Sequence, residues 1–560
     1  MVVLLPESVS AVRAALANRL QTSLNLAFGS ALASIGLTIP VVVLVAVLLD
    51  LPLSLGLAPK DIILLVLSLF VCSIGLGNGR TNMMQGAAQV VIFAVFLFLS
   101  LVPPEQAEVA MRQPLHRIIQ GMMFLAAIAG STTAQAQSQA LIDQVKAVIA
   151  ADTPRLEATF KDLHRNPELA FTETRTAAIV AAELKRLGFA VTTGIGKTGV
   201  VGVMQNGPGP TLWYRADMDA NGGVRETTGL PWAAKSPQTL ADGSEVDVMH
   251  ACGHDAHITW LLGAASALTQ LKAEWSGTLV VYAQPAEEVG LGARAMVDDG
   301  LWTRGLPKPD FALGSHAAPA AVGMVSNTAG VRMAGVDQLD VEFRGVGGHG
   351  SSPEMAIDPV VMAAQAVLAY QTIISRTIDP QAPAVLTVGA IRAGRDNNVI
   401  PESATLLLNL RWLKPQVREL MLKRIDEIDN GIAAAAGVPA DRMPTRTMKG
   451  HAGPLVNDSA LVERLRPGLV ALLGEGKVVG NFPTVMGSED FQEAFAPLNT
   501  PYVFLLLGVA PPERVAAAQK QGRLFPYSNH NPDFLVDLPA VTLGAQINAV
   551  AALALFGPKP

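Results

Sequence analysis

The sequence predicts an α/β protein with a central, mostly parallel sheet, preceded by three membrane-spanning helices. From residue 140 onward, helical periodicity and buried strand patterns alternate along the chain, which is typical of a parallel sheet covered by helices. Before that point, the first 110 residues carry three long apolar runs with almost no charge. The two parts of the chain therefore belong to different structural classes.

Length and composition limit the number of domains and the kinds of partner. At 560 residues, the chain is long enough for about three or four domains of roughly 150 residues each. Its net charge is −6 and no basic run occurs, which argues against nucleic-acid binding. The two cysteines, Cys72 and Cys252, are too few for a disulfide framework.

The apolar runs near the N-terminus lie at 31–49, 62–76 and 87–102. Each belongs to an uncharged stretch of about 18 or more residues, which is long enough to span a bilayer as a helix. Three buried core helices in succession are the less favoured alternative. We therefore expect residues 1–110 to form a transmembrane segment, whose orientation stays open because basic residues occur in successive loops.

Residues 111–137 have the layout of a secretory signal peptide. A basic start at Met111 is followed by a short apolar stretch at 118–129 and by Ala134-Gln-Ala136, which fits a cleavage site. Because signal peptides stand at the N-terminus, Met111 would be the original start of an exported protein, joined to residues 1–110 by gene fusion or by a misassigned start. A fourth membrane segment is the alternative, but the apolar stretch is short for one.

The α/β pattern begins after this segment. Residues 141–163 and 174–187 have helical periodicity, whereas 211–214 and 278–282 have the composition of buried strands. Strands separated by helical segments in this way favour parallel pairing within one sheet.

Acidic residues follow both predicted strands. Asp217 and Asp219 come after the first strand, and Glu287 and Glu288 come after the second. Because functional residues of parallel sheets gather beyond the strand ends, we expect these carboxylates to converge.

The segment 250–257, His-Ala-Cys-Gly-His-Asp-Ala-His, is the most informative part of the chain. It combines a thiol with three imidazoles, and the Glu287–Glu288 pair follows it. These side chains hold zinc-like divalent cations, and a spare carboxylate can serve as a base. A packed core requires none of them, so the segment indicates a metal-dependent hydrolase.

Residues 331–444 change character and indicate a smaller inserted domain. The strand patterns lie at 339–343, 384–388 and 405–410, and the helix patterns lie at 358–375 and 416–436. This pattern predicts a two-layer α+β domain. Residues 138–330 and 445–560 would then form one catalytic domain interrupted by the insertion.

Nine short segments occur in a fixed order, at 163–169, 215–219, 249–257, 284–288, 314–316, 345–349, 398–401, 486–491 and 530–532. Together they resemble the amidohydrolase branch of the dinuclear aminoacylase/carboxypeptidase metallopeptidase family, which includes hippurate hydrolases and auxin-conjugate hydrolases. The resemblance covers residues 140–555. It implies the metallopeptidase catalytic domain for the α/β part and a lid and dimerisation domain for the insertion.

The resemblance also implies a role for particular residues. Two divalent ions, zinc first and manganese, cobalt or nickel as alternatives, would be held by Cys252, His254, Glu288, His316 and His530. The Cys252 thiolate would lie between the two ions. Glu287 would be the general base that takes a proton from the attacking water and passes it to the departing amine.

Further residues are expected beside these ligands, where they would orient them. The carboxylates in this set are Asp217, Asp219, Asp255 and Glu489, and the imidazoles are His250 and His257. His164 is expected to be a structural histidine with satisfied hydrogen bonds. His116 and His451 match no motif and are expected to be solvated.

In the inserted domain, the resemblance implies that His349 and Asn398 stabilise the oxyanion formed during amide hydrolysis. Arg411 is the candidate for binding a substrate carboxylate. The family uses this domain for dimerisation and substrate closure, so a homo-oligomer is expected.

Residues 5–8 and 25–40 resemble the second repeat of calcium/proton antiporters, with Glu7 at the position of a membrane-embedded, ion-carrying glutamate. Such transporters require two inverted repeats. Because one partial repeat is present, we expect a remnant that does not transport ions by itself.

The leading hypothesis is an exported amidohydrolase that releases an amino acid from a small N-acyl or N-aryl conjugate. A carboxypeptidase or dipeptidase with the same machinery is the nearest alternative, and a membrane antiporter fragment and a non-catalytic binding protein are others. The chain departs from the family at 220–223, Ala-Asn-Gly-Gly, where relatives commonly have Ala-Leu-Pro, and at Ala317 and Ala318, where larger side chains are frequent. The acyl pocket is therefore expected to be roomier.

Export predicts that the natural product is cleaved after Ala136. N-terminal sequencing should then find a mature end near Gln137, in the periplasm or outside the cell. An intact chain beginning at Met1 would contradict processing and would leave the hydrolase attached to the membrane through residues 1–110.

Overall fold

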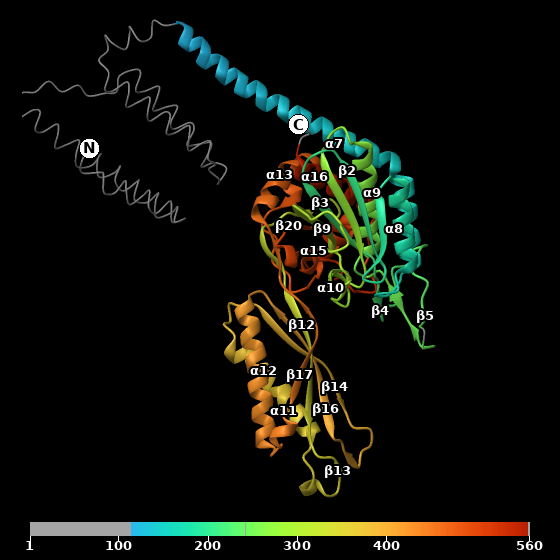
Figure 1. Cartoon of the computed structure of the whole chain (residues 1–560), viewed down its shortest axis with the longest axis vertical. Helices are drawn as coiled ribbons and strands as arrows, with labels where there is room; N and C mark the ends of the chain where they lie inside the picture. The colour runs from blue at the N-terminus through green and yellow to red at the C-terminus, as the bar shows by residue number, and fades with distance from the viewer. Residues whose placement is uncertain (1–113, 241, 558–560) are drawn as a thin grey trace, which may run out of the picture. The chain divides into compact units, whose positions relative to one another are not determined.

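The computed structural model describes residues 114–240 and 242–557. The predicted membrane helices and Glu7 lie outside these residues. Backbone contacts divide the chain into two units, residues 1–129 and 130–560, and every strand described below belongs to the second unit. This unit is an α/β structure with one sheet of eight strands and another of four (Figure 1).

The first two helices agree with the periodicity of the sequence. Helix α7 spans Pro114–Arg165 and includes the predicted helix at 141–163 together with the signal-like segment from residue 114. Helix α8 spans Thr174–Arg186, and its buried residues recur three or four positions apart, as on one face of a helix.

The eight-stranded sheet has the order β1-β2-β8-β3-β9-β20-β10-β19. Its longer strands are β1 (Ala190–Ile195), β2 (Gly199–Asn206), β3 (Thr211–Asp217), β8 (Gly277–Gln284), β9 (Phe311–Ala321) and β20 (Tyr502–Ala510), and its short ones are β10 (Val325–Ser326) and β19 (Val478–Val479). The central strands β8, β3, β9 and β20 run parallel, and β10 is parallel to β19. The pairs β1–β2, β2–β8 and β10–β20 are antiparallel.

The α/β class is thus confirmed. The sheet is mixed, because its four central strands are parallel as predicted, whereas antiparallel pairs lie on both sides of them. The turn between β1 and β2 explains part of the difference. Gly196 and Lys197 both have positive φ values, of 62° and 81°, and reverse the chain within a few residues. So short a connection can join only antiparallel strands. Apolar patterning locates a strand but does not show its direction.

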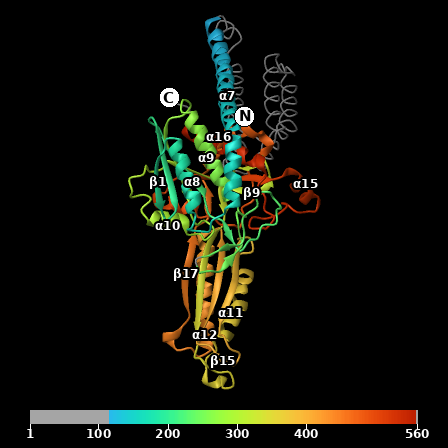
Figure 2. The same cartoon turned by 90° about the vertical axis from the view of Figure 1, so that its right-hand side faces the viewer.

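Two helices pack closely together beside the large sheet (Figure 2). They are α9 (His254–Gln270) and α16 (Leu538–Phe556). A Cβ atom at Gly544 would lie 2.2 Å from the Trp260 indole nitrogen, so only glycine permits this approach. Among the described helices, α16 alone has the length and apolar composition to cross a membrane, but most of it is buried in this core.

The four-stranded sheet is antiparallel, with the order β14-β16-β12-β17. Its strands are β12 (Gly335–Arg344), β14 (Ala384–Ala393), β16 (Ser403–Trp412) and β17 (Thr445–Ala452). Helices α11 (Pro359–Thr372) and α12 (Pro415–Ala435) pack on it around a separate hydrophobic core. Burial alternates along β12 and β16, as expected for strands with one face against helices.

Four further α-helices and eight short strands belong to the described part of the chain. The helices are α10 (Gly292–Asp298), α13 (Ser459–Leu473), α14 (Phe491–Phe495) and α15 (Pro512–Lys520). The strands are β4 (Asn221–Gly222), β5 (Gln238–Thr239), β6 (Glu245–Val246), β7 (Val248–Met249), β11 (Gly330–Met333), β13 (Gly348–His349), β15 (Val399–Ile400) and β18 (Leu455–Asn457).

A buried carboxylate joins four elements at one end of the smaller sheet. Asp337 on β12 accepts hydrogen bonds from the Trp412 indole at 3.1 Å, from Arg418 at 2.7 and 3.0 Å, and contacts His451 Nδ1 at 2.6 Å. The His451 ring also stacks on Trp412. His451 is therefore a partner of Asp337, and its side chain stays 39% exposed, in agreement with the prediction that it is solvated. The sequence did not indicate this partner, because the residue facing it on β12 is distant in sequence.

We predict that Asp337→Ala lowers the free energy of unfolding by about 2 kcal/mol, because it leaves charged donors without their acceptor. Burial opposes ionisation, but the hydrogen bonds from His451 and Arg418 lower the pKa of Asp337. The contribution of ionised Asp337 to the free energy of unfolding is thus present above its unfolded-state pKa, and it is lost as the pH falls through the lower folded-state pKa. Calorimetric unfolding at several pH values measures it. Asp340→Ala, on the same strand, is the control, and equal stability of the two variants would contradict the prediction.

Candidate metal centre

The residues of the site come from parallel strands and from the start of a helix. In the register of the large sheet, Asp217 at the end of β3 pairs with Gln284 at the end of β8. His316 lies on the neighbouring strand β9, two residues beyond Gly314, which pairs with β3. Three segments distant in sequence therefore reach the same edge of the sheet.

The thiol enters this edge on the turn between β7 and α9. Gly253 has a φ of 86°, and a Cβ atom there would lie 2.7 Å from that of Ala317. Glycine is thus required between Cys252 and His254 for the turn to pass against β9. The turn directs both neighbouring side chains into the site.

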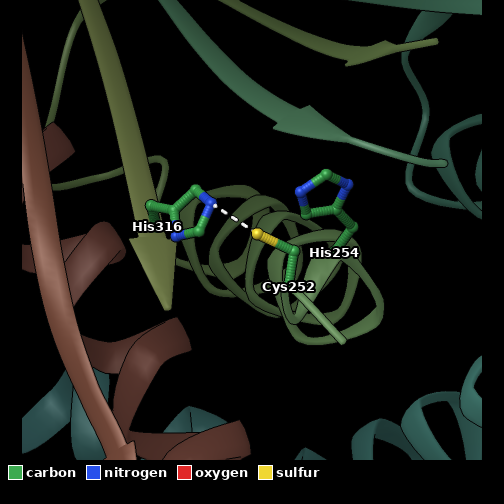
Figure 3. Close-up of side chains that lie close together, drawn as sticks. All are labelled: Cys252, His254 and His316. Carbon is green, nitrogen blue, oxygen red and sulfur yellow. Dashed lines mark hydrogen bonds between the residues drawn. The ribbon is translucent and has the colours of Figure 1, made fainter. Parts of the chain in front are cut away.

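Two groups of side chains share the Cys252 sulfur. The inner group consists of Cys252, His254 and His316, and the outer group of Cys252, Glu288 and His530. Within each group, the possible ligand atoms all lie within 4.8 Å of one another. Figure 3 shows the sulfur directed toward His316 and beside His254.

The distances confirm that the groups overlap at the sulfur. Cys252 Sγ lies 3.4 Å from His316 Nε2 and 3.3 Å from His530 Nε2. Glu288 lies 3.2 Å from His530 and 3.7 Å from His254. The structure therefore brings together all five residues predicted as ligands.

The donor set fits divalent cations. Within residues 114–240 and 242–557, His254 Nδ1 and Nε2 and Glu288 Oε1 are buried without a hydrogen-bond partner. Buried polar atoms rarely lack a partner, so these atoms indicate that another group binds there. Burial, followed by the charges of Glu288 and Glu287, raises the pKa of the Cys252 thiol. A cation reverses this effect, because coordination deprotonates a thiol. Thiolate, imidazole and carboxylate are the ligands that zinc prefers.

The adjacent glutamates differ in their surroundings. Burial, together with the charges of Glu489 and Glu288, raises the pKa of Glu287 well above its usual range. For Glu288, burial is outweighed by His530 and His254, which lower its pKa. Carboxyl groups whose pKa values are pushed apart are suited to different roles. Glu288 is suited to remain ionised as a ligand, and Glu287 to accept and hold a proton.

Asp219 fixes the position of this pair. Its two carboxylate oxygens accept the backbone N–H groups of Glu287 at 3.0 Å and Glu288 at 2.9 Å. One of these oxygens also lies 3.4 Å from His254 Nδ1. Asp219 therefore lies where it can orient one ligand and the backbone that carries another.

Asp217 and His257 form a second support. His257 Nδ1 lies 2.5 Å from Asp217 Oδ1, and His257 Nε2 accepts the N–H of Ala317 at 2.8 Å. Because an N–H must donate, Nε2 carries no proton and Nδ1 donates to the carboxylate. Burial lowers the pKa of His257 to about 3, which agrees with a neutral ring. Both nitrogens are engaged, so His257 supports the site and is not available as a ligand.

Asp255 and His164 support the start of α9. His164 Nδ1 lies 2.7 Å from Asp255, and its Nε2 lies 3.3 Å from Glu226. Burial opposes protonation of His164, but hydrogen bonds to the two carboxylates raise its pKa to about 9. Burial lowers the pKa of the neighbouring His250 to about 4. His164 thus has the satisfied hydrogen bonds expected of a structural histidine.

Sequence reasoning missed Arg215 as a central residue. Its guanidinium is fully buried and donates to Asp217 at 2.7 Å and to Glu489 at 2.8 and 3.1 Å. It neutralises carboxylates that would otherwise repel one another. The sequence signal that could have identified Arg215 is its place inside a buried strand. Arginine is seldom fully buried without a charged partner, so this position indicates nearby carboxylates.

The residues predicted in the inserted domain separate into two locations. Arg411 donates to Ser488 at 2.6 Å. Burial lowers the pKa of Arg411, and the charge of the nearby Glu287 partly offsets this effect. Arg411 therefore lies near the site. His349 follows the opposite end of β12, roughly 30 Å along the strand from Gly335.

Asn398 lies beside His349, because its carbonyl accepts the N–H of Gly350 at 2.7 Å. Among the described residues, no hydrogen bond connects His349 or Asn398 to the inner or outer group. The structure thus brings Arg411 to the metal centre but leaves these two residues at a distance.

Comparison with known proteins agrees with these motifs. The family model of peptidase family M20/M25/M40 matches residues 213–521, and that of the sodium/calcium exchanger protein matches residues 1–102. Hippurate hydrolase from Campylobacter jejuni is 39% identical over 332 residues, which cover 59% of this chain and 82% of that protein. An IAA-amino acid hydrolase from Arabidopsis thaliana is 34% identical over 391 residues, which cover 70% of this chain and 83% of that protein.

A solved structure shows the same fold. The YXEP protein from Bacillus subtilis, described as a dinuclear metal binding peptidase from the M20 family, has a TM-score of 0.56 and 27% identity. The match covers 73% of this chain and 99% of that protein. Both resemblances that the sequence indicates are thus confirmed.

Because Cys252 belongs to both groups, we predict that Cys252→Ser loses most of its bound metal. Metal analysis of the purified protein by mass spectrometry measures the loss. Cys72→Ser, which changes the other cysteine, is the matched control and should keep its metal. Unchanged occupancy in Cys252→Ser would show that the sulfur is not a ligand.

Proposed function

The chain belongs to peptidase family M20/M25/M40 and is a metal-dependent hydrolase of amide bonds, and we propose that it cleaves N-acyl or N-aryl amino acid conjugates. The observation that carries the proposal is the overlap of two ligand groups at Cys252, next to the carboxyl group of Glu287, whose pKa is raised by burial and by neighbouring carboxylates. Relatives named for hydrolysing hippurate and IAA-amino acids support this substrate class.

Two divalent ions are proposed at the inner and outer groups, and zinc fits their thiolate and imidazole ligands best. When bound, they would polarise the substrate carbonyl and lower the pKa of water. Manganese, cobalt and nickel remain alternatives, since geometry and availability as well as affinity decide which ion a site takes.

In the proposed reaction, Glu287 takes a proton from the attacking water. The water oxygen bonds to the carbonyl carbon, the C–N bond breaks, and Glu287 passes the proton to the departing nitrogen. The products are a carboxylate and a free amino acid. Asp219 holds the backbone of Glu287 in place during both transfers.

Substrate orientation is proposed to come from Arg411, whose guanidinium would pair with the carboxylate of the amino acid. Its contact with Ser488 fixes it near Glu287. His349 and Asn398 would stabilise the oxyanion once closure of the smaller domain or a second copy of the chain brings them to the site. Residues 1–110 would attach the enzyme to a membrane wherever they are retained.

We expect Glu287→Gln to keep its metal but to lose about 100-fold or more in kcat, because the amide cannot accept the proton. The assay follows hippurate, N-acetyl amino acids, IAA-amino acids and dipeptides, with metal content measured on the same samples. Glu274→Gln, at a half-buried glutamate outside both ligand groups, is the control. Chelation should abolish wild-type activity, and added cation should restore it.

Normal turnover by Glu287→Gln would contradict the proposed base. Wild-type activity that survives exhaustive chelation would contradict the proposed mechanism. Hydrolysis of dipeptides but not of N-acyl amino acids would favour a peptidase.

A further inference from the structure

His530 differs from the other proposed ligands in exposure and in backbone conformation. Its side chain is 54% exposed, whereas that of His254 is fully buried. It lies in an irregular segment, residues 529–533, and has a φ of 64°, in the left-handed region. A residue other than glycine keeps this conformation only where its surroundings hold it. The position of this ligand therefore depends on what fastens segment 529–533.

Contacts on two sides fasten the segment. On one side, the N–H of His530 donates to the carbonyl of Ala251 at 2.8 Å. On the other side, the N–H of Thr227 donates to the carbonyl of Pro532 at 2.9 Å. The Thr227 hydroxyl also donates to the carboxylate of Asp533. Thr227 thus holds Pro532 and Asp533, the second and third residues after the ligand.

Thr227 is connected in turn to the buried part of the site. The carboxylate of its neighbour Glu226 accepts the N–H of Ala234 at 2.6 Å and lies 3.3 Å from His164. His164 also contacts Asp255 at the start of α9. The loop that carries Thr227 is therefore fixed to the helix that begins with an inner-group ligand, so it can act as a rigid anchor.

We propose that Thr227 is a positioning residue that holds His530 in place and thereby sets the affinity of the outer group for its divalent cation. The inference rests on the proposed function, because it concerns one of the two metal-binding groups. All three side chains of the inner group are buried, and none of them hydrogen-bonds Thr227 within the described residues. Loss of the Thr227 hydroxyl should therefore weaken one metal-binding step and not the other.

The test is a titration of the metal-free full chain in detergent with Zn²⁺ and with Co²⁺. Competition with a chelating indicator measures both affinities, and Co²⁺ absorption reports the ligand set of each step. Thr227→Val keeps the branched shape but lacks the hydroxyl. It should lower the affinity of the weaker binding step, which we assign to the outer group, by about 10-fold, as is usual when a residue that orients a ligand is removed. At saturating Zn²⁺, the variant should regain wild-type kcat.

Two variants make the result specific. Thr227→Ser keeps the hydroxyl and should bind both ions as the wild type does. Thr303→Val removes an exposed hydroxyl that donates to the carbonyl of Gly300, and both steps should stay unchanged.

Wild-type affinities in Thr227→Val would overturn the inference, and so would an equal loss in both steps. Thr227→Ser with the same loss as Thr227→Val would also overturn it, because the hydroxyl would then not be the cause. A wild-type chain that binds no cation would instead contradict the proposed function.

Discussion

The structure depends on the compensation of charge buried at one edge of the large sheet. Removing an ionised group from water costs several kcal/mol unless partners replace the lost hydration. Arg215 supplies a positive charge to Asp217 and Glu489, and backbone N–H groups supply donors to Asp219. Similar burial without these partners would neutralise the carboxylates and would leave no rigid site.

Hydrogen bonding is incomplete at a few atoms, and these atoms mark the candidate metal centre. In the described part of the chain, the two nitrogens of His254 and one oxygen of Glu288 are buried and form no hydrogen bond, whereas both nitrogens of His257 are engaged. Adjacent residues of similar chemistry thus differ in what remains free to bind. The same reasoning separates Glu288, which faces imidazoles, from Glu287, which faces other carboxylates.

The support of the site comes from segments far apart in sequence. The segment at 486–491 contributes Ser488 to Arg411 and Glu489 to Arg215. The loop at 226–228 reaches segment 529–533, and α9 packs against α16 near the C-terminus. Ligands from short local motifs are therefore held by contacts that no local motif contains.

The sequence alone determined the α/β class and the positions of the main helices and strands, and the family resemblance of its motifs supplied the five ligand candidates. Periodicity and motif spacing are local properties of the chain, so they can be read without coordinates. Strand direction, the partner of His451 and the central place of Arg215 required the tertiary structure. Each depends on which distant residues face one another, and that is settled by packing and by the pairing of buried charges. For the same reason, the sequence placed His349 and Arg411 in one inserted domain, and only the fold showed that they lie at opposite ends of its sheet.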